Sequence, residues 1–208
     1  MTVVLHACCG PCASACVPRL KDAGHDVTLL FANSNIDTRE EFEKRRAEAE
    51  KLAANDRVAF AALPYDHADW LEKVAKGYED APEKGARCAR CFRYNLKKAA
   101  EWAKEHGAEG FTTSLTVSPH KPSAMVFEAG REASEENGGK FLEEDFKKKD
   151  GFRLSVARAR ELGLYRQSYC GCEFSFRSRK HFGILLENLR DGGMEFRPSR
   201  RRETYGNG

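Results

Sequence analysis

The chain has 208 residues, which is enough for one well-buried core, and it contains no long Gly/Ser or Pro linker that would divide it into two domains. Its formal net charge is only +3, so the total charge does not identify a class of partner. The opening MTVVLHACCGPC has too short an apolar run for a signal peptide or a membrane span. We therefore expect a single domain over residues 1–208, cytoplasmic and without a membrane.

The first elements predicted along the chain form a strand–helix–strand unit. An apolar run at Val3–Ala7 predicts a strand, the helical stretch after it stops before Gly24, and Val27–Ala32 predicts a second strand. Such a unit implies that the two strands are parallel. Thr38-Arg-Glu-Glu then matches a capping box and predicts the start of a second helix.

Strands and helices continue to alternate beyond this unit. Val58–Leu63 and Phe111–Leu115 predict strands, and apolar spacing from Phe92 to Ala103 predicts an amphipathic helix that closes at His106-Gly107. The alternation predicts an α/β fold with a mostly parallel sheet flanked by helices, whose ligands bind beyond the carboxyl ends of the strands. Further helices are predicted at residues 121–136, 155–162 and 178–190. The C-terminal part of the chain is therefore expected to be helical.

The C-terminal stretch of the sequence is basic. Residues 177–202 contain eight Arg or Lys against three Asp or Glu, so they carry +5 of the net charge. A basic stretch of this kind can contact a phosphate backbone, and it can equally be a solvated helix face followed by a frayed tail. Residues 181–208 are therefore treated as a basic C-terminal extension.

Seven of the eight cysteines fall into three tight groups. In a reducing compartment such groups are typical of metal or redox sites rather than of disulfides. Seven thiolates exceed the four that one tetrahedral zinc ion or one cubane cluster needs, so we predict two metal centres. Cys16, one helical turn beyond the first group, is expected to pack in the buried face of its helix. The predicted metal ligands are Cys8, Cys9, Cys12, Cys88, Cys91, Cys170 and Cys172.

The first group allows more than one interpretation. Adjacent residues at the end of a strand point to opposite faces, so Cys8 and Cys9 are expected to serve different centres or to bridge two ions. Spacing alone does not distinguish zinc from iron. Cys9-Gly-Pro-Cys12 is similar to the active-site motif of thioredoxin-like oxidoreductases, but the additional Cys8 and the other two groups argue against simple dithiol exchange.

Six motifs, in this order along the chain, resemble the QueH family of epoxyqueuosine reductases. They are LHACCGPCAS, FANSNI with the E-x-F-x-x-R that follows it, PEKGARCARCFRYNL, FTTSLTVSPHK, DFKKKDG and LYRQSYCGCEFS, and they extend from residue 3 to about residue 180. The resemblance implies an adenine-nucleotide-hydrolase-like (Rossmann-like) fold and a 4Fe-4S cluster beside a mononuclear iron. It also implies the last step of queuosine biosynthesis, in which epoxyqueuosine at the wobble position of tRNA becomes queuosine.

The sequence departs from the family pattern in three places. The family often has an aromatic residue and a proline where this chain reads Phe31-Ala-Asn-Ser-Asn35. Some members carry an aspartate at the position of Cys12, which implies that this position serves the isolated iron rather than the cluster. Residues 181–208 match no family motif, so nothing is carried over to them.

The reaction implied by the resemblance sets the chemistry that the site must supply. Removing an epoxide oxygen to leave an alkene takes two electrons and two protons and releases water. We hypothesise that the cluster relays electrons from an external donor while the second iron acts as a Lewis acid. That iron would be held by Cys12, one of Cys8 and Cys9, and one of Cys170 and Cys172, which leaves four cysteines for the cluster.

Side chains within and near these motifs are candidates for proton transfer and for contacts with tRNA. The candidate proton donors are His120, Asp66, Tyr169 and Asp37, although a loop histidine bonded to backbone is an equally ordinary role for His120. The candidate phosphate contacts are Lys121, Arg166, Lys147, Lys148 and Lys149. A role as ordinary solvated surface charges is equally compatible with the sequence. The candidates for stacking on a flipped base are Phe92, Tyr94 and Tyr165. For Phe92, packing in the core is the better prediction.

Two other classes of function remain open. An iron-sulfur, ATP-using enzyme similar to tRNA sulfurtransferases would need a Gly-rich phosphate loop after the first strand. Here that place holds CCGPCAS, whose Gly10 and Pro11 offer few backbone amides. A zinc-stabilised RNA-binding module without catalysis is the second alternative, and it predicts a colourless protein with stoichiometric zinc.

Overall fold

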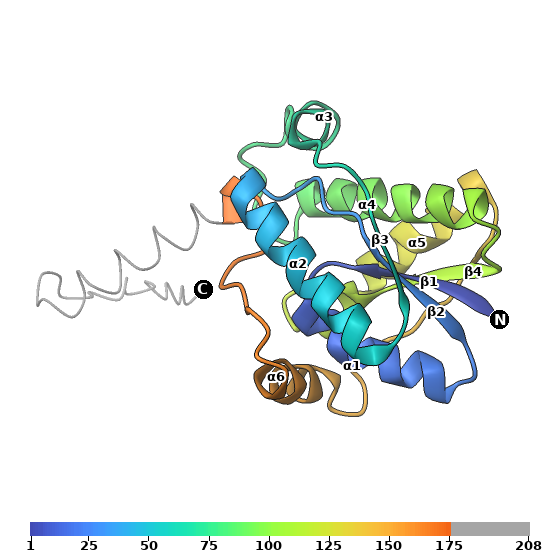
Figure 1. Cartoon of the computed structure of the whole chain (residues 1–208). Coiled ribbons are helices and arrows are strands. Elements are labelled where there is room, and N and C mark those ends of the chain that lie inside the picture. The colour runs from blue at the N-terminus through green and yellow to red at the C-terminus, as the bar shows by residue number, and fades with distance from the viewer. Residues whose placement is uncertain (176–208) are drawn as a thin grey trace, which may run out of the picture.

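The computed structural model describes residues 1–175 (Figure 1). Their centre is a five-stranded sheet in the order β3-β2-β1-β4-β5, in which every pairing is parallel. The predicted α/β fold class is therefore confirmed, while the helix predicted at 178–190 and the basic extension lie outside the described residues. The strands are β1 (Thr2–Ala7), β2 (Asp26–Phe31), β3 (Ala59–Ala62), β4 (Gly110–Thr113) and β5 (Lys140–Phe141).

Helices cover both faces of this sheet and form two cores (Figure 1). Helices α1, α2 and α6 pack on one face, and α4 and α5 pack against each other on the other face. In the described part of the chain no helix is both long enough and apolar enough to cross a membrane. The long helices are α1 (Gly10–Asp22), α2 (Arg39–Asp56), α4 (Ala86–Glu105), α5 (Ser123–Asn137) and α6 (Gly151–Glu161).

Local sequence signals explain where several helices begin. The Thr38 hydroxyl accepts a hydrogen bond from the Glu41 amide at 3.2 Å, so Thr38 is the N-cap of α2, at the position predicted for the start of this helix. Helix α1 begins directly after β1, with Cys9 as its N-cap residue and Pro11 in its first turn. The thiols of the first cysteine group therefore lie at the junction between the central strand and a helix N-terminus.

The structure differs from the sequence prediction at three elements. The strand predicted at Phe111–Leu115 ends at Thr113, because the Thr113 hydroxyl accepts from the Leu115 amide at 3.1 Å and starts a 3₁₀ turn, η2 (Ser114–Val117). The two-residue strand β5 was not predicted. The short helix α3 (His67–Trp70), which continues into one π-helical turn, η1 (Leu71–Ala75), was not predicted either.

Candidate metal centre

A cavity of about 310 Å³ lies beyond the carboxyl ends of the central strands. Its walls come from segments far apart in the sequence: the residues after β1, β2 and β4, the first turn of α4, and the segment after α6. This is the position in which an open parallel sheet usually binds its ligand. The cysteines that line the cavity are Cys9, Cys12, Cys88, Cys91, Cys170 and Cys172.

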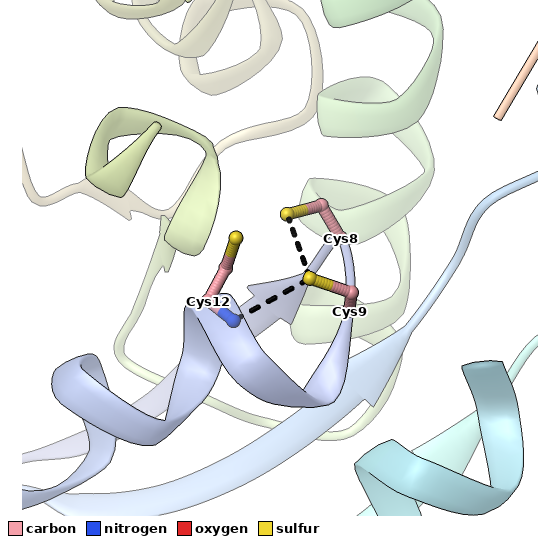
Figure 2. Close-up of side chains that lie close together, drawn as sticks. All are labelled: Cys8, Cys9 and Cys12. Carbon is pink, nitrogen blue, oxygen red and sulfur yellow. Dashed lines mark hydrogen bonds between the residues drawn. The ribbon is translucent and has the colours of Figure 1, made fainter. Parts of the chain in front are cut away.

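Cys8, the seventh grouped cysteine, forms a compact triad with Cys9 and Cys12 at this cavity (Figure 2). The sulfurs of Cys8 and Cys9 lie 4.0 Å apart, and the three sulfurs of Cys8, Cys9 and Cys12 lie within 4.8 Å of one another. Sulfurs bound to one ion at about 2.3 Å can be separated by at most about 4.6 Å, so this spacing is close to what a single ion requires. The donor set of the structure therefore fits a metal.

The expectation that Cys8 and Cys9 point to opposite faces is wrong. Strand β1 ends at Ala7, and Cys8 lies in a bend, so strand alternation no longer applies to the pair. The chain turns into α1 at Cys9, whose sulfur accepts a hydrogen bond from the Cys12 amide at 3.4 Å. Figure 2 shows how this turn directs the three sulfurs toward one another.

Gly10, inside the CCGPC motif, permits a close contact between two helices. A Cβ atom at Gly10 would lie 2.7 Å from the backbone oxygen of Glu48 in α2, a contact that neither backbone can relieve without moving. The glycine therefore lets the N-terminus of α1 approach α2 closely, and this fixes where the triad lies.

The triad and one lysine form an electrostatic unit. Hydrogen bonds from Cys12 and Cys9 hold the pKa of Cys8 well below its usual value, although burial opposes the shift. The hydrogen bond with Cys12 works to lower the pKa of Cys9, but the contact with Cys8 and burial outweigh it and raise that pKa to about 12. Burial likewise lowers the pKa of Lys121, but the thiolate charges of Cys170 and the triad raise it by more. The Lys121 ammonium thus offsets negative charge at the site.

The C-x-x-C pair, Cys88 and Cys91, lies in the first two turns of α4. The Lys84 amide donates to the Cys88 sulfur at 3.3 Å, and the Asn95 side-chain amide donates to the Cys91 sulfur at 3.6 Å. Burial and the nearby thiols of Cys170 and Cys172 raise the pKa of Cys91 well above its usual value. Both sulfurs therefore already have N–H donors, which is the environment that stabilises a thiolate ligand to metal.

Arg45, in α2, anchors the C-x-C loop formed by Cys170, Gly171 and Cys172. Its Nη1 donates to the Cys170 carbonyl at 2.9 Å and its Nη2 to the Tyr169 carbonyl at 3.4 Å, while its Nε bonds Glu41 at 2.7 Å. Gly171 has φ +133°, and a Cβ atom there would come within 3.1 Å of the Arg45 guanidinium. The backbone conformation therefore favours glycine between the two cysteines, and Arg45 leaves little room for a Cβ atom there.

Three of the four candidate proton donors lie at or beside the cavity. His120 is exposed at its rim, and Tyr169 lines its wall and donates to the Asp37 carboxylate at 2.9 Å. Burial and that carboxylate raise the pKa of Tyr169. Asp66 does not line the cavity; it caps α3 by accepting from the Asp69 amide at 3.1 Å. The assignment of a proton donor among them stays a prediction.

The candidate phosphate contacts occupy different environments. Arg166 is exposed at the cavity rim, and Lys121 is half-buried in its wall. The Lys147 ammonium donates to the carbonyls of Ser118 and Lys121, at 3.3 and 2.6 Å, so it stabilises the loop that carries Lys121. The exposed members of the adjacent loop are Lys148 and Lys149.

Of the candidate stacking residues, only one lines the cavity. Phe92 does so, but it is 5% exposed and belongs to the core, as predicted. The Tyr94 hydroxyl donates to Asp69 at 2.6 Å, and the Tyr165 ring lies 3.5 Å from the Lys44 ammonium. Cys16 is fully buried in α1 and donates to the Cys12 carbonyl, so its expected packing role is confirmed.

Sequence reasoning missed several residues that build the site. Arg45 ends the E-x-F-x-x-R motif, and its position in that motif was the available signal. Trp70 and Phe152 line the cavity, the second with 40% of its surface exposed, and neither carries a sequence signal that distinguishes it from ordinary core or surface aromatics.

Comparisons with known proteins find one family model and several relatives that match this chain. The family model described as epoxyqueuosine reductase QueH matches residues 3–178. The QueH protein of Streptococcus pyogenes is 35% identical over 201 residues, covering 94% of this chain and 77% of its own. That of Thermotoga maritima is 35% identical over 182 residues, covering 86% and 92%. Among solved structures, the zinc-inhibited form of teicoplanin deacetylase Orf2 aligns with a TM-score of only 0.44 at 8% identity, over 91% of this chain and 94% of that one.

The family match covers all three cysteine groups, the loop that carries Lys121, and the E-x-F-x-x-R motif that supplies Arg45. The relatives match along most of their own length as well as most of this one. The chain therefore belongs to the QueH family of epoxyqueuosine reductases, and with it to the oxidoreductases.

Proposed function

We propose that this protein reduces epoxyqueuosine in tRNA to queuosine in the cytoplasm, with a 4Fe-4S cluster and a second iron held by the seven grouped cysteines. The observation that carries the proposal is the convergence of three distant cysteine groups on one cavity. Their number supports two centres rather than one, because a single cluster or ion leaves three thiols without a ligand role.

The donor environment supports iron held by thiolates. Sulfurs of all three members of the triad are close together, and those of Cys88 and Cys91 already accept N–H hydrogen bonds. When bound, the cluster would supply electrons one at a time and the second iron would supply a Lewis acid for the epoxide oxygen. The cysteines hold these groups in place, and Lys121 offsets part of their negative charge.

Two divisions of the seven thiols are compatible with the described geometry. In the first, the triad alone holds the single iron, as its spacing favours. In the second, the single iron is held by Cys12, one of its two triad partners and one cysteine of the C-x-C loop. This division is favoured because the charges of Cys170 and of the triad both raise the pKa of the same side chain, Lys121. Both divisions assign Cys12 to the single iron and assign Cys88 and Cys91 to the cluster.

The reaction itself tests the proposed function. Iron-replete protein, prepared anaerobically, is mixed with epoxyqueuosine-containing tRNA and a chemical electron donor, and the nucleosides are then analysed by mass. The reaction consumes two electrons and two protons, so the expected product is queuosine, lighter than the substrate by one oxygen atom. Absence of queuosine overturns the proposal, and a colourless protein with stoichiometric zinc would support the RNA-binding module instead.

Arg166 offers a test of the tRNA contact. It is exposed at the rim of the cavity, where a guanidinium can reach a phosphate that flanks the target base. We expect Arg166→Gln to weaken tRNA binding and to lower the slope of log K against log salt concentration by about 0.7 to 0.9, the effect of one lost phosphate contact. Binding is measured by fluorescence anisotropy over a series of salt concentrations.

The matched control is Arg160→Gln. Arg160 is also exposed and carries the same charge, but it lies in the last turn of α6 and does not line the cavity. Equal losses of affinity in the two variants would show that only net charge matters, and would remove Arg166 from the proposed contacts.

A further inference from the structure

Trp70 is a buried aromatic residue in the cavity wall with an unused hydrogen-bond donor. Its side chain is 1% exposed, and its indole N–H has no hydrogen-bond partner among the described residues. Buried donors without partners are rare in folded proteins, and each one calls for an explanation. An indole nitrogen can only donate a hydrogen bond, so the partner must be an acceptor that is placed in or near the cavity.

Sulfur atoms are candidates for that acceptor. Trp70 lies in a cluster that includes Cys91 and Cys172, and both of these cysteines line the cavity with it. Cys91 is buried, which raises the pKa of its thiol, and the Trp70 N–H acts in the opposite direction by favouring the thiolate. The Trp70 N–H is therefore placed to donate to the Cys91 sulfur, although it forms no hydrogen bond with the thiol in the structure.

The Trp70 ring is held in a fixed orientation. It stacks on His67, with ring centroids 5.4 Å apart and an interplanar angle of 14°, and it contacts the tilted Phe174 ring at 6.4 Å. His67 is itself bonded to the Ser34 carbonyl at 2.9 Å. A donor carried by such a fixed ring is preorganised, because little side-chain freedom is lost when the hydrogen bond forms.

A second donor reaches the same sulfur from α4. The Asn95 side-chain NH2 lies 3.6 Å from the Cys91 sulfur and 3.1 Å from the Asn35 oxygen, so each of its two N–H groups has an acceptor. Asn95 is 3% exposed, so solvent has little access to this contact. Cys91 thus lies between the unused donor of Trp70 and one N–H of Asn95, whereas the donor to Cys88 is the backbone amide of Lys84.

Hydrogen bonds to cluster sulfurs favour the reduced, more negative form and so raise the reduction potential. We propose that Trp70 is a positioning residue whose indole N–H donates to the Cys91 sulfur when that cysteine ligates the cluster, and that this contact sets the potential at which the cluster accepts an electron. The inference rests on the cluster of the proposed function and extends it to the control of electron entry.

Trp70→Phe tests the inference, because it removes the N–H and keeps an aromatic ring in the stack. Both proteins are reconstituted anaerobically, their iron and sulfide contents are measured, and the cluster is titrated by electron paramagnetic resonance against redox mediators. We expect unchanged iron and sulfide and a lower midpoint potential, with a reduction equilibrium up to about tenfold less favourable, which is about 59 mV for one electron. Trp102→Phe is the matched control, since Trp102 stacks on His106 and does not line the cavity.

A second measurement uses the unaltered protein. With ¹⁵N in the tryptophan indoles, electron–nuclear double resonance of the reduced cluster should show a coupled ¹⁵N and an exchangeable proton, and both should be lost in Trp70→Phe. An unchanged potential in an iron-replete variant, or no such coupling in the unaltered protein, overturns the inference and leaves the proposed function intact. A reconstituted protein without any iron-sulfur signal would instead overturn the proposed function, and the inference with it.

Discussion

Cys88→Ser and Cys91→Ser proteins, prepared anaerobically, are expected to lose the cluster iron and sulfide, and reductase activity should fall below detection. These cysteines lie in the first two turns of α4 with N–H donors to their sulfurs, and both divisions of the thiols assign them to the cluster. Serine is similar in size to cysteine but binds iron poorly as a neutral hydroxyl, since soft thiolate ligands select iron-sulfur centres. Iron, sulfide and activity are measured on the same preparations.

The Cys12→Ser protein should behave differently from these two. Because Cys12 is assigned to the single iron, we expect this variant to keep its sulfide and cluster spectrum, to lose about one iron per chain, and to be inactive. Cys16→Ala is the matched control: Cys16 lies one turn further along α1, fully buried, and should affect neither metal content nor activity. Loss of the whole cluster from Cys12→Ser would refute both divisions of the thiols.

Arg45→Met should destabilise the protein by about 3 to 5 kcal/mol, the cost of removing one partner from a buried ion pair. The Arg45 side chain is 2% exposed, and without it the carbonyls of Tyr169 and Cys170 lose its N–H donors, while the Glu41 carboxylate loses its ion pair and keeps the Tyr165 hydroxyl. The C-x-C loop then loses its hydrogen bonds from Arg45, so the iron content should fall as well. Chemical denaturation under anaerobic conditions measures the free energy of unfolding.

The neighbouring Arg46 provides the control for this prediction. It makes ion pairs with Glu43 and Glu50 on the same helix, but its side chain is 35% exposed. Exposed pairs of this kind contribute little, so Arg46→Met should change the free energy of unfolding by less than about 1 kcal/mol. If both variants lost the same stability, the effect would belong to helix α2 in general and not to the anchor of the C-x-C loop.

The elements with strong local signals were predictable from the sequence. Strand β1 is a buried apolar run between a terminus and a Gly-Pro turn, and Thr38 carries its cap within its own segment. The cysteines were predicted to be metal ligands because seven of them fall into three groups with tight spacing. These features depend on neighbours in the sequence, which is why periodicity and spacing reveal them.

The features that were missed depend on contacts between distant segments. Whether Cys8 and Cys9 share a site is decided by where β1 stops, and Arg45 becomes an anchor only because residues 169–171 return to α2. Trp70 belongs to a four-residue helix, too short to show a hydrophobic repeat. No local pattern encodes such placements, so the sequence predicted the set of ligands without their arrangement.

The convergence of the three cysteine groups also has a consequence for how the protein is made. The groups lie at residues 8–12, 88–91 and 170–172, so the ligand set is incomplete until nearly all of the described chain has left the ribosome. In both divisions the cluster joins Cys88 and Cys91 to the C-x-C loop and so closes a large loop of the chain, and such closure restricts the unfolded chain much as a cross-link does. Metal insertion would then be the last step of maturation, and iron starvation would leave a looser apoprotein exposed to proteases.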